Sequence, residues 1–224
     1  MHGDLAELLL AHRLGGAWRA PLGTRLRAVP AQQVFGTARI VEAGSADCAR
    51  AHAALCPVPM ASFDLAGALH PFAALLAQAR LAEGFDDAAR PPLAKAGAGG
   101  AVLILGARAA SPALVAQALA AYALAGRAVL FKPAPRAAVS GAYVLRALGL
   151  AGLAGPVVAM VHGGGATGRL LMAHGGWGQV LILGKGHARA GLPALPVPDA
   201  AGLMAALAMP APLGDPLLMT RNSA

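Results

Sequence analysis

The sequence predicts an α/β fold in which helices cover both faces of a parallel β-sheet. Three observations support this prediction. Short apolar runs bounded by glycine, such as AVLILG, recur in the second half of the chain, and strands buried on both faces of a parallel sheet have this pattern. Segments of helical periodicity alternate with these runs, as in βαβ units. The composition, 57% hydrophobic and 12% charged over 224 residues, is that of one well-buried domain.

Four strands and three helices are expected in this regular core, which we place at residues 101–191. The strands are expected at 101–106, 127–133, 155–162 and 179–184. The helices are expected at 112–125, 138–150 and 167–174. Pro112 suits the first turn of a helix, because the N–H that proline lacks would have no partner there.

Residues 1–90 are less regular, and we expect them to form an N-terminal arm of hairpin and helices. Alternating apolar and polar residues at 12–29 predict a β-hairpin, and the pattern at 33–44 predicts a further strand. Ser45 is expected to cap the helix that follows. Asp47 falls in the first turn of that helix, where a negative charge favours the helix dipole.

The remaining boundaries follow from composition. A second helical pattern at 64–85 leads into a linker at 91–100, which is rich in proline, glycine and alanine. A proline-rich C-terminal tail is expected at 192–224, with one short helix near 200–209.

Charge and hydropathy limit the partners of this chain. The net charge of +8 comes mainly from scattered arginines, and only 4% of the residues are aromatic, so we expect no nucleic-acid partner. The uncharged stretches 109–126 and 147–168 are interrupted by turn residues, so we expect no membrane span. No signal peptide is visible, and Cys48 and Cys56 are expected as free thiols of a cytoplasmic protein.

A glycine-rich turn is the strongest local signal for a ligand. Gly163, Gly165 and Gly168 match the pattern G-x-G-x-x-G after an expected strand and before an expected helix, which is the context of a dinucleotide-binding turn. The acidic residue that would bind a ribose is missing, since nothing acidic follows before Asp199. The lysine and hydroxyl residue of a Walker A loop are missing too, so NTP hydrolysis is not expected. A close-packed turn without a ligand is the alternative.

The segment AGRAVLFKPAPRAAVSGAYVLRALGLAGLAGPVVAMVHGGGATGRLLMAHGGWGQVLILGKGHARAG resembles the coenzyme-binding core of the aldehyde dehydrogenase superfamily. In that family one strand ends in Lys-Pro, the next leads into a glycine-rich turn, and a third ends in Phe-Thr-Gly-Ser. RLGGAWRAP and VEAGSADCARAHAAL resemble the family's N-terminal strand and first helix. The resemblance covers residues 11–56 and 100–191, and it implies a Rossmann-like parallel sheet with an N-terminal arm.

The resemblance also implies a binding site for NAD or NADP. Lys132, followed by Pro133, corresponds to the family lysine that reaches the adenosine ribose. The family glutamate that shares this task corresponds to Pro135, so we expect weak binding. Arg136 would favour the 2′-phosphate of NADP.

Two glycine turns complete the implied site. Gly163, Gly165 and Gly168 correspond to the family turn near the adenine end of the coenzyme. Gly184 corresponds to the glycine of the Phe-Thr-Gly-Ser turn, whose serine helps to hold the pyrophosphate. Lys185 stands at that serine position, where a cation would either neutralise a phosphate or occupy its space.

No catalytic residue is expected. The family's nucleophile is a cysteine beyond the Gly-Ser turn, and no cysteine follows Lys185 in this sequence. The general base is a glutamate, and no glutamate follows Glu83. The family's oxyanion-binding asparagine would fall near RAASP, which contains none. The family's catalytic domain is thus expected to be missing, and the chain to be a truncated pseudoenzyme.

Three functions remain open. The first is a structural or regulatory subunit that binds NAD(P) weakly, as a homo-oligomer or in complex with a catalytic subunit. The second is an oxidoreductase component that oxidises aldehydes with NAD(P) only when a partner chain supplies the catalytic residues. The third is a nucleotide-free scaffold, which Pro135 and Lys185 favour. No metal is expected, because the spacing of His162, His174 and His187 does not predict a ligand set.

Overall fold

The structure is a computed structural model, and it describes residues 7–29, 37–57, 74, 77, 99–107, 110–153, 155–184 and 195–197. Apart from residues 74 and 77, the helical pattern predicted at 64–85 lies outside this set. Residues 91–98 of the predicted linker and the short helix predicted near 200–209 also lie outside it.

A seven-stranded sheet forms the centre of the fold, in the order β10-β9-β6-β7-β8-β2-β3. Five of these strands are parallel: β6 (Val102–Gly106), β7 (Val129–Lys132), β8 (Val158–Met160), β9 (Gln179–Leu183) and β10 (Leu195–Val197). From β6 the chain adds β7 and β8 on one side and then β9 and β10 on the other, so the strand order reverses between β6 and β9, as in doubly wound α/β sheets. This confirms the predicted Rossmann-like parallel sheet.

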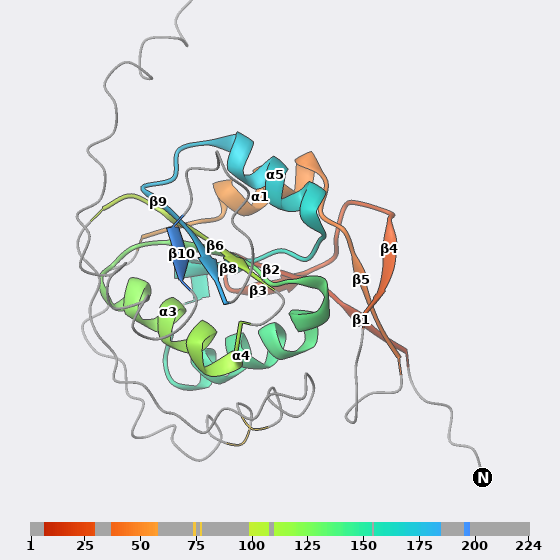
Figure 1. Cartoon of the computed structure of the whole chain (residues 1–224), viewed down its shortest axis with the longest axis horizontal. Coiled ribbons are helices and arrows are strands. Elements are labelled where there is room, and N and C mark those ends of the chain that lie inside the picture. The colour runs from red at the N-terminus through yellow and green to blue at the C-terminus, as the bar shows by residue number, and fades with distance from the viewer. Residues whose placement is uncertain are drawn as a thin grey trace, which may run out of the picture.

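Helices cover both faces of this sheet (Figure 1). One face carries α3 (Pro112–Leu124) and α4 (Ala138–Leu150), and the other carries α1 (Ser45–Ala53) and α5 (Gly165–His174). Side chains of β6 alternate between the faces: Ile104 packs with the α3 and α4 cluster, and Leu103 packs with the α1 and α5 cluster. The continuous apolar runs thus arise because both faces of each strand are buried.

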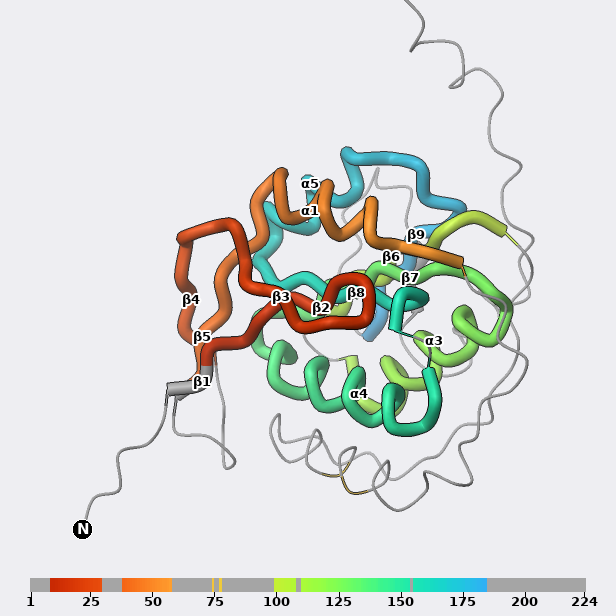
Figure 2. Tube along the Cα trace, turned by 180° about the vertical axis from the view of Figure 1, so that it is seen from behind, coloured from red at the N-terminus to blue at the C-terminus, as the bar shows by residue number. Residues whose placement is uncertain are grey.

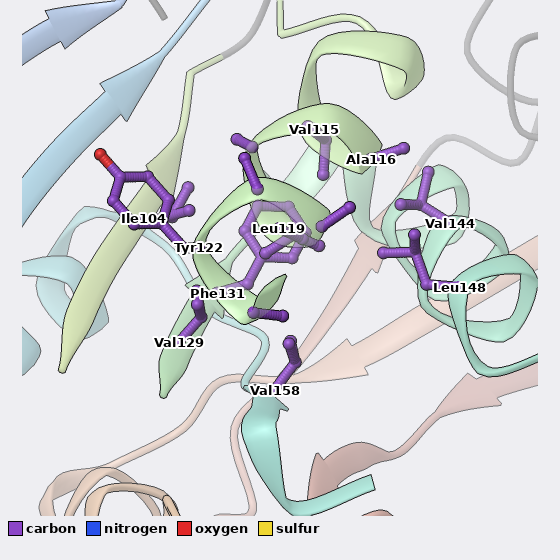
Figure 3. Packing of buried hydrophobic residues seen from close by; sticks show 14 of the residues in the cluster. Ile104, Val115, Ala116, Leu119, Tyr122, Val129, Phe131, Val144, Leu148 and Val158 are labelled. Atoms are coloured by element: carbon purple, nitrogen blue, oxygen red, sulfur yellow. The ribbon is translucent and has the colours of Figure 1, made fainter. Parts of the chain in front are cut away.

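The larger core lies beneath α3 and α4. Figure 3 shows Leu119 and Tyr122 of α3 beside Phe131 of β7 in this core. Tyr122 is fully buried, and its hydroxyl donates a 2.9 Å hydrogen bond to the side-chain oxygen of Gln179. The Arg127 guanidinium donates to the same oxygen, so the polar end of this large aromatic residue is paired where β9 begins.

The N-terminal arm joins the central sheet to a second, smaller sheet. The antiparallel pair β2 (His12–Leu14) and β3 (Ala17–Arg19) continues the central sheet beyond β8. The second sheet has the order β1-β5-β4. Its members are β1 (Glu7–Leu10), β4 (Leu26–Val29) and β5 (Thr37–Val41).

The predicted hairpin at 12–29 is shorter than expected. Its turn is formed by Gly15 and Gly16, whose positive φ values of 56° and 83° suit a two-residue hairpin turn. β4 lies in the predicted segment but pairs with β5 instead of closing the hairpin. Between β3 and β4, the Asp47 side chain of α1 accepts hydrogen bonds from the backbone of Leu22 and Gly23 and so redirects the chain.

Helix starts agree with prediction for two helices and differ for two others. The structure confirms that Pro112 lies in the first turn of α3, and α4 has the predicted bounds. The N-cap of α3 is Ser111, whose hydroxyl accepts a hydrogen bond from the Leu114 N–H. α5 begins at Gly165, two residues before the predicted start. The N-cap of α1 is Gly44 rather than the predicted Ser45.

The parallel sheet also extends into the predicted tail. β10 pairs with β9 through Leu195–Val197, at the outer edge of the sheet. Pro196 made this segment look unlike a strand, but an edge strand tolerates a proline because one of its sides needs no ladder hydrogen bonds. Within the part of the chain that the structure describes, no helix is both long and apolar enough to cross a membrane.

Candidate functional site

The predicted site residues lie along the carboxyl ends of neighbouring parallel strands. Lys132 ends β7, the turn at 163–168 follows β8, and Gly184 follows β9. β6 lies between β7 and β9, and beyond its end the Ala107 N–H donates a 2.7 Å hydrogen bond to the Leu183 carbonyl. Open α/β sheets bind ligands outside the carboxyl ends of their strands, where the strand order changes direction.

Lys132 is the most constrained member of this edge. Its side chain is only 6% exposed, and its ammonium donates 3.0 Å hydrogen bonds to the carbonyl oxygens of Pro133 and Gly163. Burial lowers the pKa of Lys132 to about 8, while the nearby Glu42 carboxylate opposes this shift. The lysine therefore ties the end of β7 to the glycine turn after β8.

The three glycines of the turn differ in how much space a side chain would have. A Cβ at Gly163 would overlap the Thr167 side chain, whose hydroxyl donates a 2.9 Å hydrogen bond to the Ala43 carbonyl. A Cβ at Gly168 would lie 3.4 Å from Cε of Lys132. At Gly165 a Cβ would meet only the Arg169 guanidinium, at 3.9 Å. Packing thus explains Gly163, but nothing in the described protein requires glycine at 165.

The N-terminus of α5 presents backbone N–H groups at this edge. Its N-cap is Gly164, which offers no side-chain cap, and its first turn contains no acidic residue. Gly165 and Ala166 are exposed. The N–H groups in the first turn of a helix lack helical partners and favour an anion.

A buried carboxylate lies beside this turn, and the sequence pattern did not predict it there. Glu42 follows β5, is 8% exposed, and pairs with Arg25 at 3.2 Å and with Arg27. A Cβ at Gly164 would lie 3.0 Å from a carboxylate oxygen of Glu42 and 3.2 Å from the Arg27 guanidinium. Glu42 therefore brings a negative charge and two arginines to the edge that holds Lys132.

The other predicted site residues have mixed positions. Pro133 is buried and lies against Gly106 at the end of β6. Arg136 is exposed in the short 3₁₀ turn Pro135–Ala137 that follows β7, so it lies at the same edge. Lys185 lies outside the residues that the structure describes. The coenzyme-binding roles of the whole set stay predictions.

Neither cysteine of the chain lies at this edge. Cys48 is 2% exposed in the core under α1, and burial together with the charge of Asp47 raises the pKa of its thiol to about 11. Cys56 is exposed, but its backbone N–H donates to the Pro156 carbonyl, ahead of the amino end of β8. Both thiols are therefore placed for packing or solvent contact, away from Lys132.

Two of the three histidines considered as metal ligands lie beside another histidine ring. His162 is fully buried beside His12, and His174 stacks on His52 with ring centroids 4.3 Å apart. His187 lies outside the described residues. Among the described residues, no group of three or more His, Cys, Asp and Glu side chains could hold a metal ion.

Comparison with known proteins identifies the family. The family model described as "Aldehyde dehydrogenase family" matches residues 76–189. The chain belongs to the aldehyde dehydrogenase family. This confirms the resemblance drawn from the Lys-Pro segment and the two glycine turns. No curated protein sequence gave a significant match.

Solved aldehyde dehydrogenases share the fold of this chain. One is the Delta-pyrroline-5-carboxylate dehydrogenase from Mycobacterium tuberculosis bound with NAD and cobalamin, with 17% identity, a TM-score of 0.61, and coverage of 80% of this chain and 42% of that chain. Another is a mutant of aldehyde dehydrogenase C from Pseudomonas syringae in complex with NAD⁺ and octanal, with 21% identity, a TM-score of 0.60, and coverage of 77% and 45%. This aldehyde dehydrogenase-like chain spans less than half the length of either structure.

Proposed function

We propose that this chain binds NAD or NADP weakly along the carboxyl edge of its parallel sheet and serves as a cytoplasmic structural or regulatory subunit without dehydrogenase chemistry of its own. The observation that carries the proposal is the position of Lys132, which is buried between its own strand end and the glycine turn of the next strand. Both features correspond to coenzyme contacts in the family.

The residues of the edge suit a dinucleotide. A lysine ammonium has three N–H donors. Two of the donors of Lys132 bond to backbone carbonyls, so the third can donate to a ribose hydroxyl. The uncapped N-terminus of α5 offers backbone N–H groups to an anionic group. Arg136, exposed at the same edge, supplies a cation for a 2′-phosphate. The dinucleotide itself would supply a hydride acceptor.

The absence of dehydrogenase chemistry is supported by the two thiols. A nucleophilic cysteine must be accessible and readily deprotonated. The thiol of Cys48 is buried and its pKa is raised. The backbone of Cys56 is hydrogen-bonded to Pro156, just before the amino end of β8 and therefore at the opposite end of the strands from Lys132. A catalytic role would therefore require a nucleophile other than these two thiols, and complexes with a catalytic subunit or between copies of this chain are part of the proposal.

One observation favours the alternative of a nucleotide-free scaffold. The two carbonyls that accept from Lys132 give this buried ammonium protein partners without any ligand. Pro135 stands where the family has a ribose-binding glutamate, which removes one expected contact.

A thermal-shift series with NAD⁺, NADP⁺ and their reduced forms separates these functions. A ligand at 100 times its Kd adds about 2.7 kcal/mol to the free energy of unfolding, which raises Tm measurably. The proposal expects such a rise with at least one dinucleotide at millimolar concentration, and a smaller rise with NADP⁺ in R136Q. No rise with any of the four supports the scaffold. Aldehyde oxidation by the chain alone contradicts the non-catalytic part, and co-purification from the native host identifies a partner.

A further inference from the structure

A pocket lies between the N-terminal arm and helix α4, and its lining contains none of the residues predicted to bind the coenzyme. It has a volume of about 310 Å³. Its wall on the arm comes from Leu9, Leu10, Ala11 and Trp18, and its wall on α4 comes from Val139, Ala142, Tyr143 and Arg146. Figure 2 shows β2 and β3 passing just above α4. We propose that this pocket binds a small amphiphilic carboxylate, with its apolar body against Trp18 and its carboxylate on Arg146.

The helical wall of the pocket is one continuous face of α4. Positions 139, 142, 143 and 146 follow the spacing that places side chains on the same side of a helix. Val139 is buried and packs with Leu10 in the core under the second sheet, so it forms a fixed floor. The hollow is therefore held open by packed residues on both of its sides.

Two large apolar side chains border this hollow and stay half exposed. Trp18 is 46% exposed and Leu9 is 54% exposed. Exposed apolar groups around a concave surface mark ligand sites more often than flat surface does. The volume lies at the small end of the range for ligand pockets, about 300–1,000 Å³, and therefore suits a small molecule rather than a helix or a folded partner.

The charge of the lining selects the polar group of the ligand. Arg146 is exposed and is the charged member of the lining. Its planar guanidinium can donate two parallel hydrogen bonds to a carboxylate. Burial raises the pKa of the neighbouring Tyr143 phenol, although the Arg146 charge opposes this shift, so the aromatic ring beside the guanidinium is uncharged at neutral pH. An apolar body with one carboxylate matches both halves of the pocket.

The pocket contains its own reporter. The sequence has two tryptophans, and Trp177 lies on the α1 and α5 face, where its indole N–H donates to the Leu171 carbonyl. In W177F, all tryptophan emission comes from Trp18. Titration of the full chain with phenylbutyrate should change that emission saturably, whereas butyrate, which lacks the ring, should not. Calorimetry on the unsubstituted chain gives the same affinity without the W177F substitution.

Three variants make the test specific. R146Q should weaken phenylbutyrate binding about tenfold or more, because a hydrogen bond to a charged group is lost. R146Q should bind the uncharged analogue phenylbutanol as the unsubstituted chain does. A142F should abolish binding by filling the hollow. R169Q, a matched loss of an exposed arginine on α5, should change nothing.

The outcomes divide cleanly. A saturable signal that R146Q weakens for the carboxylate alone supports the proposal. No saturable response to phenylbutyrate at millimolar concentration overturns it, as does an R146Q affinity equal to that of the unsubstituted chain. If circular dichroism shows that A142F is unfolded, the comparison of R146Q with R169Q decides.

Discussion

The ammonium nitrogen of Lys132 lies 3.0 Å from the carbonyl oxygen of Gly163, and this hydrogen bond joins the end of β7 to the turn that follows β8. The two strands are parallel neighbours, with Phe131 opposite Met160, so their carboxyl ends meet at one edge of the sheet. A lysine and a glycine turn that both resemble coenzyme contacts of the aldehyde dehydrogenase family are thus in direct contact.

Two glycine substitutions separate packing from ligand contact in this turn. G163A should lower the free energy of unfolding by about 1–3 kcal/mol, because the new methyl overlaps Thr167 and forces the turn to move. G165A should leave stability nearly unchanged, since its methyl has open space, but it should weaken dinucleotide binding if the coenzyme approaches the backbone there. Urea unfolding and dinucleotide titration of both variants check this. A G165A chain as unstable as G163A would contradict the assigned packing.

Acid should destabilise the fold through a buried histidine pair. Burial lowers the pKa of His12 to about 4 and that of His162 to about 3, from an ordinary value of 6.5. The unfolded chain therefore binds more protons than the fold below pH 6.5, and stability falls as pH decreases from there to about 4. Each histidine contributes a slope of about 1.4 kcal/mol per pH unit across this window.

The histidine pair can be tested by replacing one ring. His12 accepts a hydrogen bond at Nδ1 from the backbone N–H of His162, and a glutamine oxygen can accept the same bond. H12Q should therefore fold at neutral pH and lose stability less steeply in acid, by about one proton's slope. Urea midpoints measured between pH 7 and 4.5 give the two slopes. Equal slopes would show that His12 does not stay neutral in the fold.

Asp47 should stabilise the arm through its backbone contacts. Its carboxylate is 1% exposed and accepts hydrogen bonds from the N–H groups of Leu22 and Gly23 and from the Arg50 guanidinium. D47A leaves these donors without their acceptor and should cost about 1–3 kcal/mol. D47N keeps one acceptor oxygen and should cost less. Equal unfolding midpoints for D47A and the unsubstituted chain would contradict this role.

The two thiols should differ strongly in reactivity. Cys56 is exposed, whereas Cys48 is buried with a pKa raised to about 11. A thiol-specific chromogenic reagent at pH 8 should modify one thiol per chain rapidly and the second only after urea unfolding. In C56S the fast phase should disappear. A fast phase that persists in C56S would place Cys48 in contact with solvent.

Local sequence patterns were sufficient to predict the order of strands and helices in the core, because the strands are buried on both faces and each helix lies between two glycine or proline boundaries. The strand predicted at 155–162 is shorter than expected, since Gly155–Val157 form a 3₁₀ turn and β8 contains only Val158–Met160. β10 was missed because Pro196 is tolerated only where the strand lies at an edge, and position in the sheet is not a local property. Successive βα units predict that Lys132 and Gly163 lie at the same edge of the sheet. The hydrogen bond between them could not be predicted from the same pattern.

The surroundings of the turn depend on residues far apart in the chain. Glu42 and Arg27 lie against Gly164 because the second sheet brings the end of β5 to this edge, and nothing in the sequence near Gly164 indicates them. For the same reason the sequence could not show that Gly163 is required by Thr167 whereas Gly165 has open space. Packing between distant segments decides which glycines serve the fold and which remain available to a ligand.

Isothermal titration calorimetry of the chain and of K132M with NAD⁺ and NADP⁺ tests the central claim most directly. Methionine retains the apolar stem of the buried lysine and removes its donors. The account predicts saturable binding of at least one dinucleotide by the unsubstituted chain and a loss of about tenfold or more in affinity in folded K132M. No binding heat with either dinucleotide at millimolar concentration, or equal affinities for the two chains, would contradict it.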